Sequence, residues 1–368
     1  MRKRPLVGAG FAVLAAAALA ASSTSAAEPQ ATGTSSTPPY SWGGFKLSPD
    51  IAAKLKAKKP LQIVMSAQET SSPIAPADYK LGLQRGAATD SKGGVKISAR
   101  LIGPVTTDAA QQVSQIEAIL NGKGADCLGI QPVSEQGFVK LFNEAYARGV
   151  PIFAVNTDAP HSKRFAYYGL NEFKGGQQVG SAFVAWAKKQ SKPVKKIAFL
   201  TGDPAASWAQ DRMRGFYAAV HSALPDVQFL DSPSKAVGTT YEQPKIFAAA
   251  QAYLQGHSDV DVIVHTDEGG SVVGDVIQKL GMKGKVRVVM WNTFPAVFDG
   301  IQKGVIVLAL DQALDRQAEA FEHACVNYLL HGRVPSGPIQ AVPGTLVTAA
   351  NVAQARAAFN KTHPHYGG

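Results

Sequence analysis

The sequence predicts an α/β protein built from two similar doubly wound parallel sheets. Short apolar segments alternate with amphipathic segments of helical length along most of the chain, which is typical of successive right-handed βαβ units. The alternation runs to about residue 170 and then begins again, and each half has the size of one domain. A chain of 368 residues also exceeds what one hydrophobic core usually holds. We therefore expect two lobes.

Residues 149–160, GVPIFAVNTDAP, show the pattern best in the first half. The apolar run 152–155 is typical of a strand buried on both faces, and Asn156 and Asp158 follow it directly. Open α/β sheets bind ligands at this end of their strands. The other elements expected in this half are strands at 61–65, 95–102 and 127–130 and helices at 78–90, 108–120 and 134–147.

The second half repeats the same order of strand and helix. Its expected strands are 196–201, 227–230, 260–265, 286–291 and 305–310, and its expected helices are 172–190, 207–224, 241–255, 269–280 and 295–303. A long helix at 316–330 and a strand-like segment at 344–348 follow.

Residues 1–27 have the pattern of a secretory signal peptide. Arg2, Lys3 and Arg4 precede an uncharged apolar stretch at 6–21, and small residues follow up to residue 27. This stretch is shorter than the roughly 20 residues of a membrane span, and no cysteine near the cleavage point could accept a lipid. We expect a cleaved signal and a freely soluble periplasmic protein. Residues 28–60 are expected to form a flexible lead-in with a short helix after Ser48, and residues 361–368 a tail.

Composition argues against disordered, fibrous and nucleic-acid-binding classes. Hydrophobic residues make up 45% of the chain and charged residues 17%, as in ordinary globular proteins. The net charge of +10 includes the three cations of the expected signal peptide, and the remaining excess is dispersed over expected helices and loops. Solvated helix faces therefore explain the charge better than a polyanion-binding surface does.

The two cysteines, Cys127 and Cys325, allow two interpretations. An oxidising compartment favours a disulfide, but the apolar neighbours of both residues suit buried free thiols equally well. Two cysteines without a histidine pattern do not indicate a zinc site. We expect no metal and no cofactor.

Polar side chains follow the expected strands in both halves, where a ligand site would lie. One such residue is usually a helix N-cap, but several at equivalent strand ends indicate a shared site, and amide and carboxylate groups match adjacent sugar hydroxyls. The candidates are Ser66, Gln68, Gln131, Asn156, Asp158, Thr266, Asp267, Asn292, Asp311 and Gln312.

Aromatic residues supply candidates for the apolar faces of a sugar ring. Trp208 and Arg212 are one helical turn apart, so both could face one cleft. Tyr79 follows the loop 69–77, and Trp291 ends an expected strand. Core packing remains the alternative for Trp208, and a surface charge the alternative for Arg212.

The chain resembles the periplasmic binding proteins of the ribose and galactose type, the solute receptors of sugar ABC transporters, over about residues 61–348. The resemblance rests on the order and spacing of several segments rather than on any one of them. They are VSQIE at 113–117, GIQPV at 129–133, ARGVP at 147–151 leading into VNTDAP at 155–160, DRMRGF at 211–216, HTDE at 265–268 and ALDQ at 309–312.

The resemblance implies two lobes joined by a three-crossover hinge with a ligand cleft between them. Lobe 1 would comprise 61–170 plus 312–336, and lobe 2 would comprise 171–311 plus 337–360, with a third crossing near 335–338. It implies that Cys127 and Cys325 share a lobe. Ligand contacts would come from Gln131, Asn156, Arg212, Thr266, Asn292, Asp311 and Gln312. Asn156 and Asn292 replace aspartates of ribose receptors, and the loop 69–78 is longer, so the ligand is expected to differ from ribose.

The function expected is a monomeric receptor, not an enzyme, that delivers a sugar or polyol to the permease subunits of an ABC importer. A receptor that presents a sugar or autoinducer-type ligand to a sensor kinase is the main alternative, and the sequence does not separate the two. A carbohydrate-acting enzyme is disfavoured because the common hydrolase, zinc-protease and nucleotide motifs are absent from the sequence. A sugar-responsive regulator would need a DNA-binding helix-turn-helix where the export signal lies.

Overall fold

The computed structural model describes residues 44–72, 74–364 and 366. The expected signal peptide and most of the lead-in therefore lie outside the described residues. The short helix expected after Ser48 is α1 (Pro49–Lys56), and the Ser48 hydroxyl caps it by accepting a hydrogen bond from the amide of Ile51.

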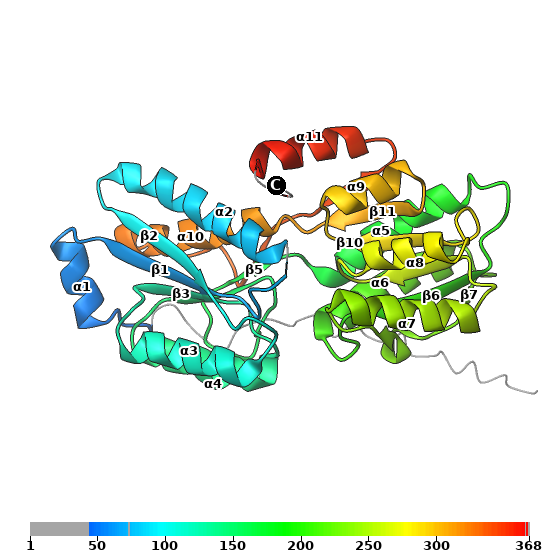
Figure 1. Cartoon of the computed structure of the whole chain (residues 1–368). Helices are drawn as coiled ribbons and strands as arrows, with labels where there is room; N and C mark the ends of the chain where they lie inside the picture. Colours follow the sequence, from blue (N-terminus) through cyan, green and yellow to red (C-terminus); the bar gives the residue numbers. More distant parts are fainter. Residues whose placement is uncertain (1–43, 73, 365, 367–368) are drawn as a thin grey trace, which may run out of the picture. The chain divides into compact units, whose positions relative to one another are not determined.

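The first lobe is a parallel sheet in the order β12-β5-β4-β3-β1-β2. Its helices are α2 (Ala75–Asp90), α3 (Ala109–Asn121), α4 (Glu135–Ala147) and α10 (Leu314–His331). Figure 1 shows α2 and α10 over one face of this sheet and α3 and α4 over the other. The strands are β1 (Leu61–Ser66), β2 (Ile97–Ile102), β3 (Cys127–Ile130), β4 (Ile152–Val155), β5 (Tyr167–Gly169) and β12 (Ile339–Ala341).

The second lobe is a sheet in the order β13-β11-β10-β9-β6-β7, with β8 also paired to β6. Every pairing is parallel except that of β13 with β11. The strands are β6 (Lys196–Thr201), β7 (Gln228–Phe229), β8 (Val237–Gly238), β9 (Val262–His265), β10 (Arg287–Trp291), β11 (Ile306–Asp311) and β13 (Thr345–Thr348).

Two separate apolar clusters show that helices cover both faces of the second sheet. One cluster gathers residues of α7 (Gln243–Gly256), α8 (Gly270–Lys279) and α9 (Pro295–Gln302). The other gathers residues of α5 (Glu172–Ala187) and α6 (Ser207–Ala223). The predicted fold class, two doubly wound parallel-sheet lobes, is confirmed.

The chain passes between the two lobes three times. The first two passages follow β5 and β11, at residues 170–171 and 312–313. The third lies at 342–344, because Ile339–Ala341 still pairs with β5 as an edge strand of the first sheet. The expected position near 335–338 was therefore a few residues too early. A three-residue strand behind a proline-rich segment is too short to show an alternating pattern.

The helix α11 (Val352–Thr362) follows β13 and was not predicted. Its sequence, VAQARAAFNKT, is rich in alanine and has few large apolar residues to mark a buried face. Within the described residues, no helix has both the length and the apolar character required to cross a bilayer.

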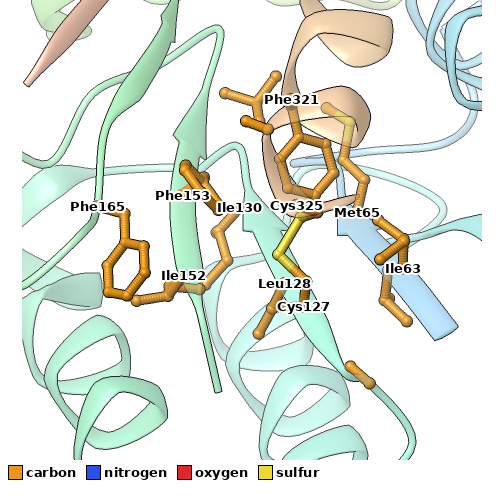
Figure 2. Packing of buried hydrophobic residues seen from close by; sticks show 14 of the residues in the cluster. Ile63, Met65, Cys127, Leu128, Ile130, Ile152, Phe153, Phe165, Phe321 and Cys325 are labelled. Carbon is orange, nitrogen blue, oxygen red and sulfur yellow. A yellow bond between two sulfur atoms is a disulfide. The ribbon is translucent and has the colours of Figure 1, made fainter. Parts of the chain in front are cut away.

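Cys127 of β3 and Cys325 of α10 form a disulfide, so the question that the sequence left open is answered. Their Cα atoms are 5.8 Å apart, and both residues are fully buried. Figure 2 shows the bond among apolar side chains that include Met65, Ile130 and Phe321. The disulfide therefore fastens α10, which follows the second passage of the chain, to the first sheet.

The helices α5 and α6 approach closely because glycines face the partner helix. A Cβ on Gly176 would lie 2.2 Å from the carbonyl oxygen of Arg212, and one on Gly215 would lie 2.1 Å from that of Phe173. Larger residues would force the helices apart. This packing helps to fix the position of Arg212, one of two residues of α6 that line the candidate site.

Candidate ligand-binding site

A cavity of about 50 Å³ lies where the carboxyl ends of strands from both lobes meet. It has room for a few water molecules. Nine residues predicted from the sequence line it: Gln68, Tyr79, Gln131, Asn156, Trp208, Arg212, Asp267, Asn292 and Gln312. Glu69, Ser72, Ala75, Tyr241, Glu268 and Leu314 complete the lining.

Side-chain amides form a chain of hydrogen bonds along the cavity and connect the two lobes. Gln131 Nε2 donates to Asn156 Oδ1 at 2.9 Å, and Asn156 Nδ2 donates to Gln312 Oε1 at 3.2 Å. Gln312 Nε2 then donates to Asn292 Oδ1 at 2.6 Å, and Asn292 Nδ2 donates to Glu268 Oε2 at 2.8 Å. Gln312 lies at the second passage between the lobes and joins both halves of the chain of bonds.

Asn156 and Asn292 occupy equivalent positions, directly after β4 and β10. Both have a left-handed backbone, with φ of 62° and 66°. Among residues other than glycine, asparagine adopts this conformation most readily. The backbone turns sharply at both strand ends, and it directs both amides toward the cavity.

Arg212 is buried, and hydrogen bonds to three separate parts of the chain hold its guanidinium in place. Its guanidinium makes two hydrogen bonds to the carboxylate of Glu172, at 2.7 and 2.9 Å. It also donates to the carbonyl oxygen of Thr266 and to Gln312 Oε1, both at 2.6 Å. The guanidinium lies 4.7 Å from the ring centre of Trp208. The predicted proximity of Trp208 and Arg212 is therefore observed, and Glu172 balances the positive charge.

Three carboxylates make the cavity acidic. Burial raises the pKa of Glu268, and the neighbouring Asp267 adds to the rise. Burial also raises the pKa of Glu69, with a contribution from Glu268. Burial opposes ionisation of Asp267, but the nearby His265 and two backbone amides outweigh it and hold the pKa of Asp267 below its usual value. Asp267 is thus a structural anion, whereas Glu69 and Glu268 have fewer compensating partners.

Tyr79 is fully buried at the cavity wall, and its hydroxyl has no hydrogen-bond partner among the residues that the structure describes. Buried hydroxyl groups almost always find a partner. A polar ligand group could supply it. Trp208, which is half-buried, and Tyr241 offer ring surfaces on the side of the second lobe.

Five of the predicted residues do not line this cavity. Ser66 Oγ accepts a hydrogen bond from Gln112, and Thr266 Oγ1 donates to Thr201 Oγ1. Trp291 is fully buried in the core of the second lobe, beneath Arg212. The remaining two, Asp158 and Asp311, have structural partners of their own.

Asp158 pairs with the buried guanidinium of Arg164, which also donates to the carbonyl oxygen of Pro338 at 2.9 Å. Arg164 thereby ties the end of β4 to the segment before β12. Asp311 accepts a hydrogen bond from the amide of Ala313 at 2.7 Å, where the chain turns into α10. Both aspartates therefore act as local turn and cap groups, the common role of such residues at strand ends.

The most important lining residue that the prediction missed is Glu268. It directly follows the predicted Asp267, and both carboxylate oxygens accept hydrogen bonds, from Asn292 and from Ser72 of the first lobe at 3.1 Å. The run of two acidic residues after a strand was an available signal. Glu69 and Ser72 belong to the loop that was noted only for its unusual length.

Comparisons with known proteins agree with this architecture. The family model described as a periplasmic binding protein domain matches residues 82–332. The xylose/arabinose-binding protein XylF of Sulfolobus acidocaldarius is 24% identical over 226 residues, which cover 57% of this chain and 53% of that protein. The chain therefore spans about half the length of this curated relative.

Two solved structures illustrate the similarity in fold. One is an ABC transporter solute-binding protein from Burkholderia graminis in complex with D-arabinose, with a TM-score of 0.70 and 18% identity over 80% of this chain and 98% of that one. The other is the fructose-binding periplasmic domain of a hybrid two-component system, with a TM-score of 0.69 and 16% identity over 83% and 96%.

These proteins are binding proteins rather than enzymes, as expected for this chain. The family model covers well over half of the sequence, and the two-lobed fold agrees with it. The chain belongs to the periplasmic binding protein family.

Proposed function

We propose that this protein captures a neutral monosaccharide or related polyol between its two lobes and delivers it to an ABC importer. One observation carries the proposal: amide and carboxylate side chains from both lobes converge on one cavity together with a single guanidinium. Such groups offer both donors and acceptors, which vicinal hydroxyl groups require. Aromatic side chains beside them would cover the apolar face of a sugar ring.

The charge of the cavity favours a neutral ligand over an anionic one. Glu69, Asp267 and Glu268 contribute three carboxylates, whereas the charge of Arg212 is balanced by Glu172. A sugar phosphate or sugar acid would bring further negative charge next to these groups, at a high cost in a buried site. The relatives named for xylose, arabinose and fructose bind neutral sugars.

Ligand entry would require the lobes to separate. The cavity is far smaller than the site a ligand usually occupies, and hydrogen bonds cross between the lobes from Ser72 to Glu268 and from Asn156 to Gln312. Opening at the three passages would break these bonds, and closure on a ligand would bury it. Hinge closure of this kind is a recognised mode of periplasmic receptors.

A thermal-shift and calorimetry panel tests the proposal. It comprises neutral pentoses and hexoses, namely D-xylose, L-arabinose, D-arabinose, D-ribose, D-glucose, D-galactose and D-fructose, together with glucose 6-phosphate and gluconate as anionic analogues. At least one neutral sugar should raise the melting temperature, and the anionic analogues should not. Absence of any neutral hit, or equal binding of the anionic analogues, would contradict the proposal.

Matched variants locate the ligand in the cavity. Glu268→Gln keeps the shape of the side chain but removes a charged acceptor, so it should weaken the sugar about tenfold or more. Glu117→Gln changes an exposed glutamate of α3 in the same way and should leave the dissociation constant unchanged. Equal affinities of both variants would show that the ligand binds elsewhere.

Ligand presentation to a sensor kinase is a second candidate, because one protein with the same fold is a domain of a two-component system. Export and a periplasmic location suit both functions. Deletion of the protein should abolish uptake of the radiolabelled sugar if transport is its role. Normal uptake together with loss of sugar-induced transcription would instead support signalling.

A further inference from the structure

We propose that Asp90, Glu322 and His323 form a binding site for a divalent cation at the contact between α2 and α10. Asp90 is the last residue of α2, and Glu322 and His323 lie on α10. None of the three lines the ligand cavity. The site would be separate from the proposed sugar site and does not depend on it.

The potential ligand atoms lie close enough to share one ion. One atom from each of the three side chains falls within 4.8 Å of the others. His323 Nδ1 is 2.8 Å from Asp90 Oδ2 and 3.5 Å from Glu322 Oε2. Glu319, one turn earlier on α10, places a further carboxylate oxygen 3.8 Å from His323 Nε2.

Glu322 supplies the independent indication that a ligand belongs there. Its side chain is fully buried, and no donor in the described part of the chain forms a hydrogen bond with either carboxylate oxygen. A buried carboxylate without a hydrogen bond is strongly unfavourable. The carboxylate faces Asp90 and His323, so an ion bound between them would satisfy it.

Two features of α2 concentrate negative charge at this point. Asp90 lies at the carboxyl end of the helix, where the helix dipole repels an anion. Gly86, one turn earlier, leaves the space that Glu322 fills, since a Cβ there would lie 2.4 Å from Glu322 Oε2. A bound cation would offset the repulsion between Asp90 and the helix dipole. It would also interact with the Glu322 carboxylate that fills the space beside Gly86.

The donor set favours a zinc-like ion. A histidine with two carboxylates leaves a coordination position for water and suits zinc or a similar transition metal better than calcium, which prefers oxygen ligands alone. The site is reachable from solvent, because the side chains of Asp90 and His323 are 21% and 33% exposed.

Calorimetric titration of zinc chloride into the tag-free, chelator-treated protein tests the site. We expect binding at one ion per chain. Asp90→Asn, Glu322→Gln and His323→Gln should each weaken zinc binding at least tenfold. His161→Gln is the matched control, because His161 also contacts a carboxylate, that of Glu135, at 2.6 Å, but is not part of the three-residue group. This variant should bind zinc as the unmodified protein does.

Sugar-induced thermal shifts of the same variants separate this proposal from the function proposed above. The sugar-induced shifts of these variants should equal that of the unmodified protein. The zinc titration needs no sugar, so its outcome does not depend on whether the sugar ligand was identified correctly. Absence of zinc binding, or equal affinities in all four variants, would overturn the cation site.

Burial and the adjacent Asp90 raise the pKa of Glu322 to about 9, so a proton is the competing occupant. If Glu322→Gln raises the stability of the protein, and zinc does not change the stability of the unmodified protein, a proton occupies the site. That result would overturn the proposal. If Glu322→Gln fails to fold, the zinc affinity of His323→Gln decides, because the side chain of His323 is accessible to solvent.

Discussion

Asn156 and Asn292 combine two functions in single residues. Each ends a buried strand with a left-handed backbone, and each directs an amide into the chain of hydrogen bonds that joins the lobes. Aspartate would also tolerate this backbone but could not donate hydrogen bonds. The asparagines therefore suit a site in which the carboxylates of Glu268 and Asp267 already supply the negative charge.

Substitutions at Asn156 should separate the backbone role from the side-chain role. Asn156→Gly and Asn156→Ala both remove the hydrogen bonds to Gln131, Gln312 and Gln317, so both should weaken ligand binding. Only alanine is strained at a φ of 62°, and it should lower the free energy of unfolding by about 1 kcal/mol more than glycine. Urea denaturation measures the difference.

Asn143, in the helix α4, provides the control. There glycine should be the more destabilising replacement by up to about 1 kcal/mol, because the backbone is helical. The same order of stability at both positions would contradict the assignment of strain to Asn156.

At the scale of elements, α10 depends on long-range connections. It follows the second passage from the other lobe and packs on α2. The disulfide from Cys325 to Cys127 of β3 spans 198 residues of sequence. A cross-link between segments so far apart restricts the unfolded chain strongly.

Replacement of both cysteines by alanine should lower the free energy of unfolding by about 2–4 kcal/mol. Urea denaturation under oxidising conditions measures this loss. Addition of a reducing agent should produce a similar loss in the unmodified protein and none in the double variant. A reducing agent that has no effect on the unmodified protein would contradict a stabilising role for the disulfide.

At the scale of the whole molecule, contacts between the lobes include a partly buried ion pair at the end of α11. His363 Nε2 lies 2.5 Å from Asp78 Oδ1 of α2, and the two side chains are 12% and 14% exposed. The ring of His363 stacks on Phe359, which contacts Phe298 of the second lobe. The pair therefore joins the second lobe to the helix that carries Tyr79.

The pH dependence of stability should reveal this pair. Burial raises the pKa of Asp78 to about 6, although His363 opposes the rise, and the hydrogen bond from Asp78 raises the pKa of His363 above 6.5. The folded chain thus holds the histidine proton more tightly than the unfolded chain does. The contribution of the pair should be largest near pH 6–6.5, where Asp78 is ionised and His363 is protonated. It should be lost as the pH rises through the higher folded-state pKa of His363, and it should decline below pH 6 as Asp78 takes up a proton.

Urea denaturation between pH 5 and 9 checks the sign. The difference in stability between the unmodified protein and His363→Gln should be largest near pH 6–6.5 and should shrink both at higher pH and toward pH 5. His221→Gln changes an exposed histidine of α6 and should not reproduce the trend. A difference that grows as the pH rises from 6.5 to 9 would refute the proposed ion pair.

The sequence alone determined the repeated α/β architecture and most positions of the candidate site. Buried parallel strands are short apolar runs, and amphipathic helices have their own period, so both are visible locally. The polar groups that end these strands also lie in a predictable place, at the carboxyl edges of the sheets. The residues Gln131, Asn156, Asn292 and Gln312 could be identified for this reason, and Arg212 because it lies one helical turn from Trp208.

Only the tertiary structure decided which polar groups face the cavity and which partners they have. Asp158 and Asn156 are two residues apart, yet one pairs with Arg164 and the other joins the amide chain. The partner of Asp158 is only six residues away, whereas those of Asn156 are far away in the sequence. The pairing of Cys127 with Cys325, the addition of β12 to the first sheet and the burial of Glu322 beside Asp90 also depend on distant segments. Local patterns carry no information about such contacts, because their free energy arises only when distant segments pack together.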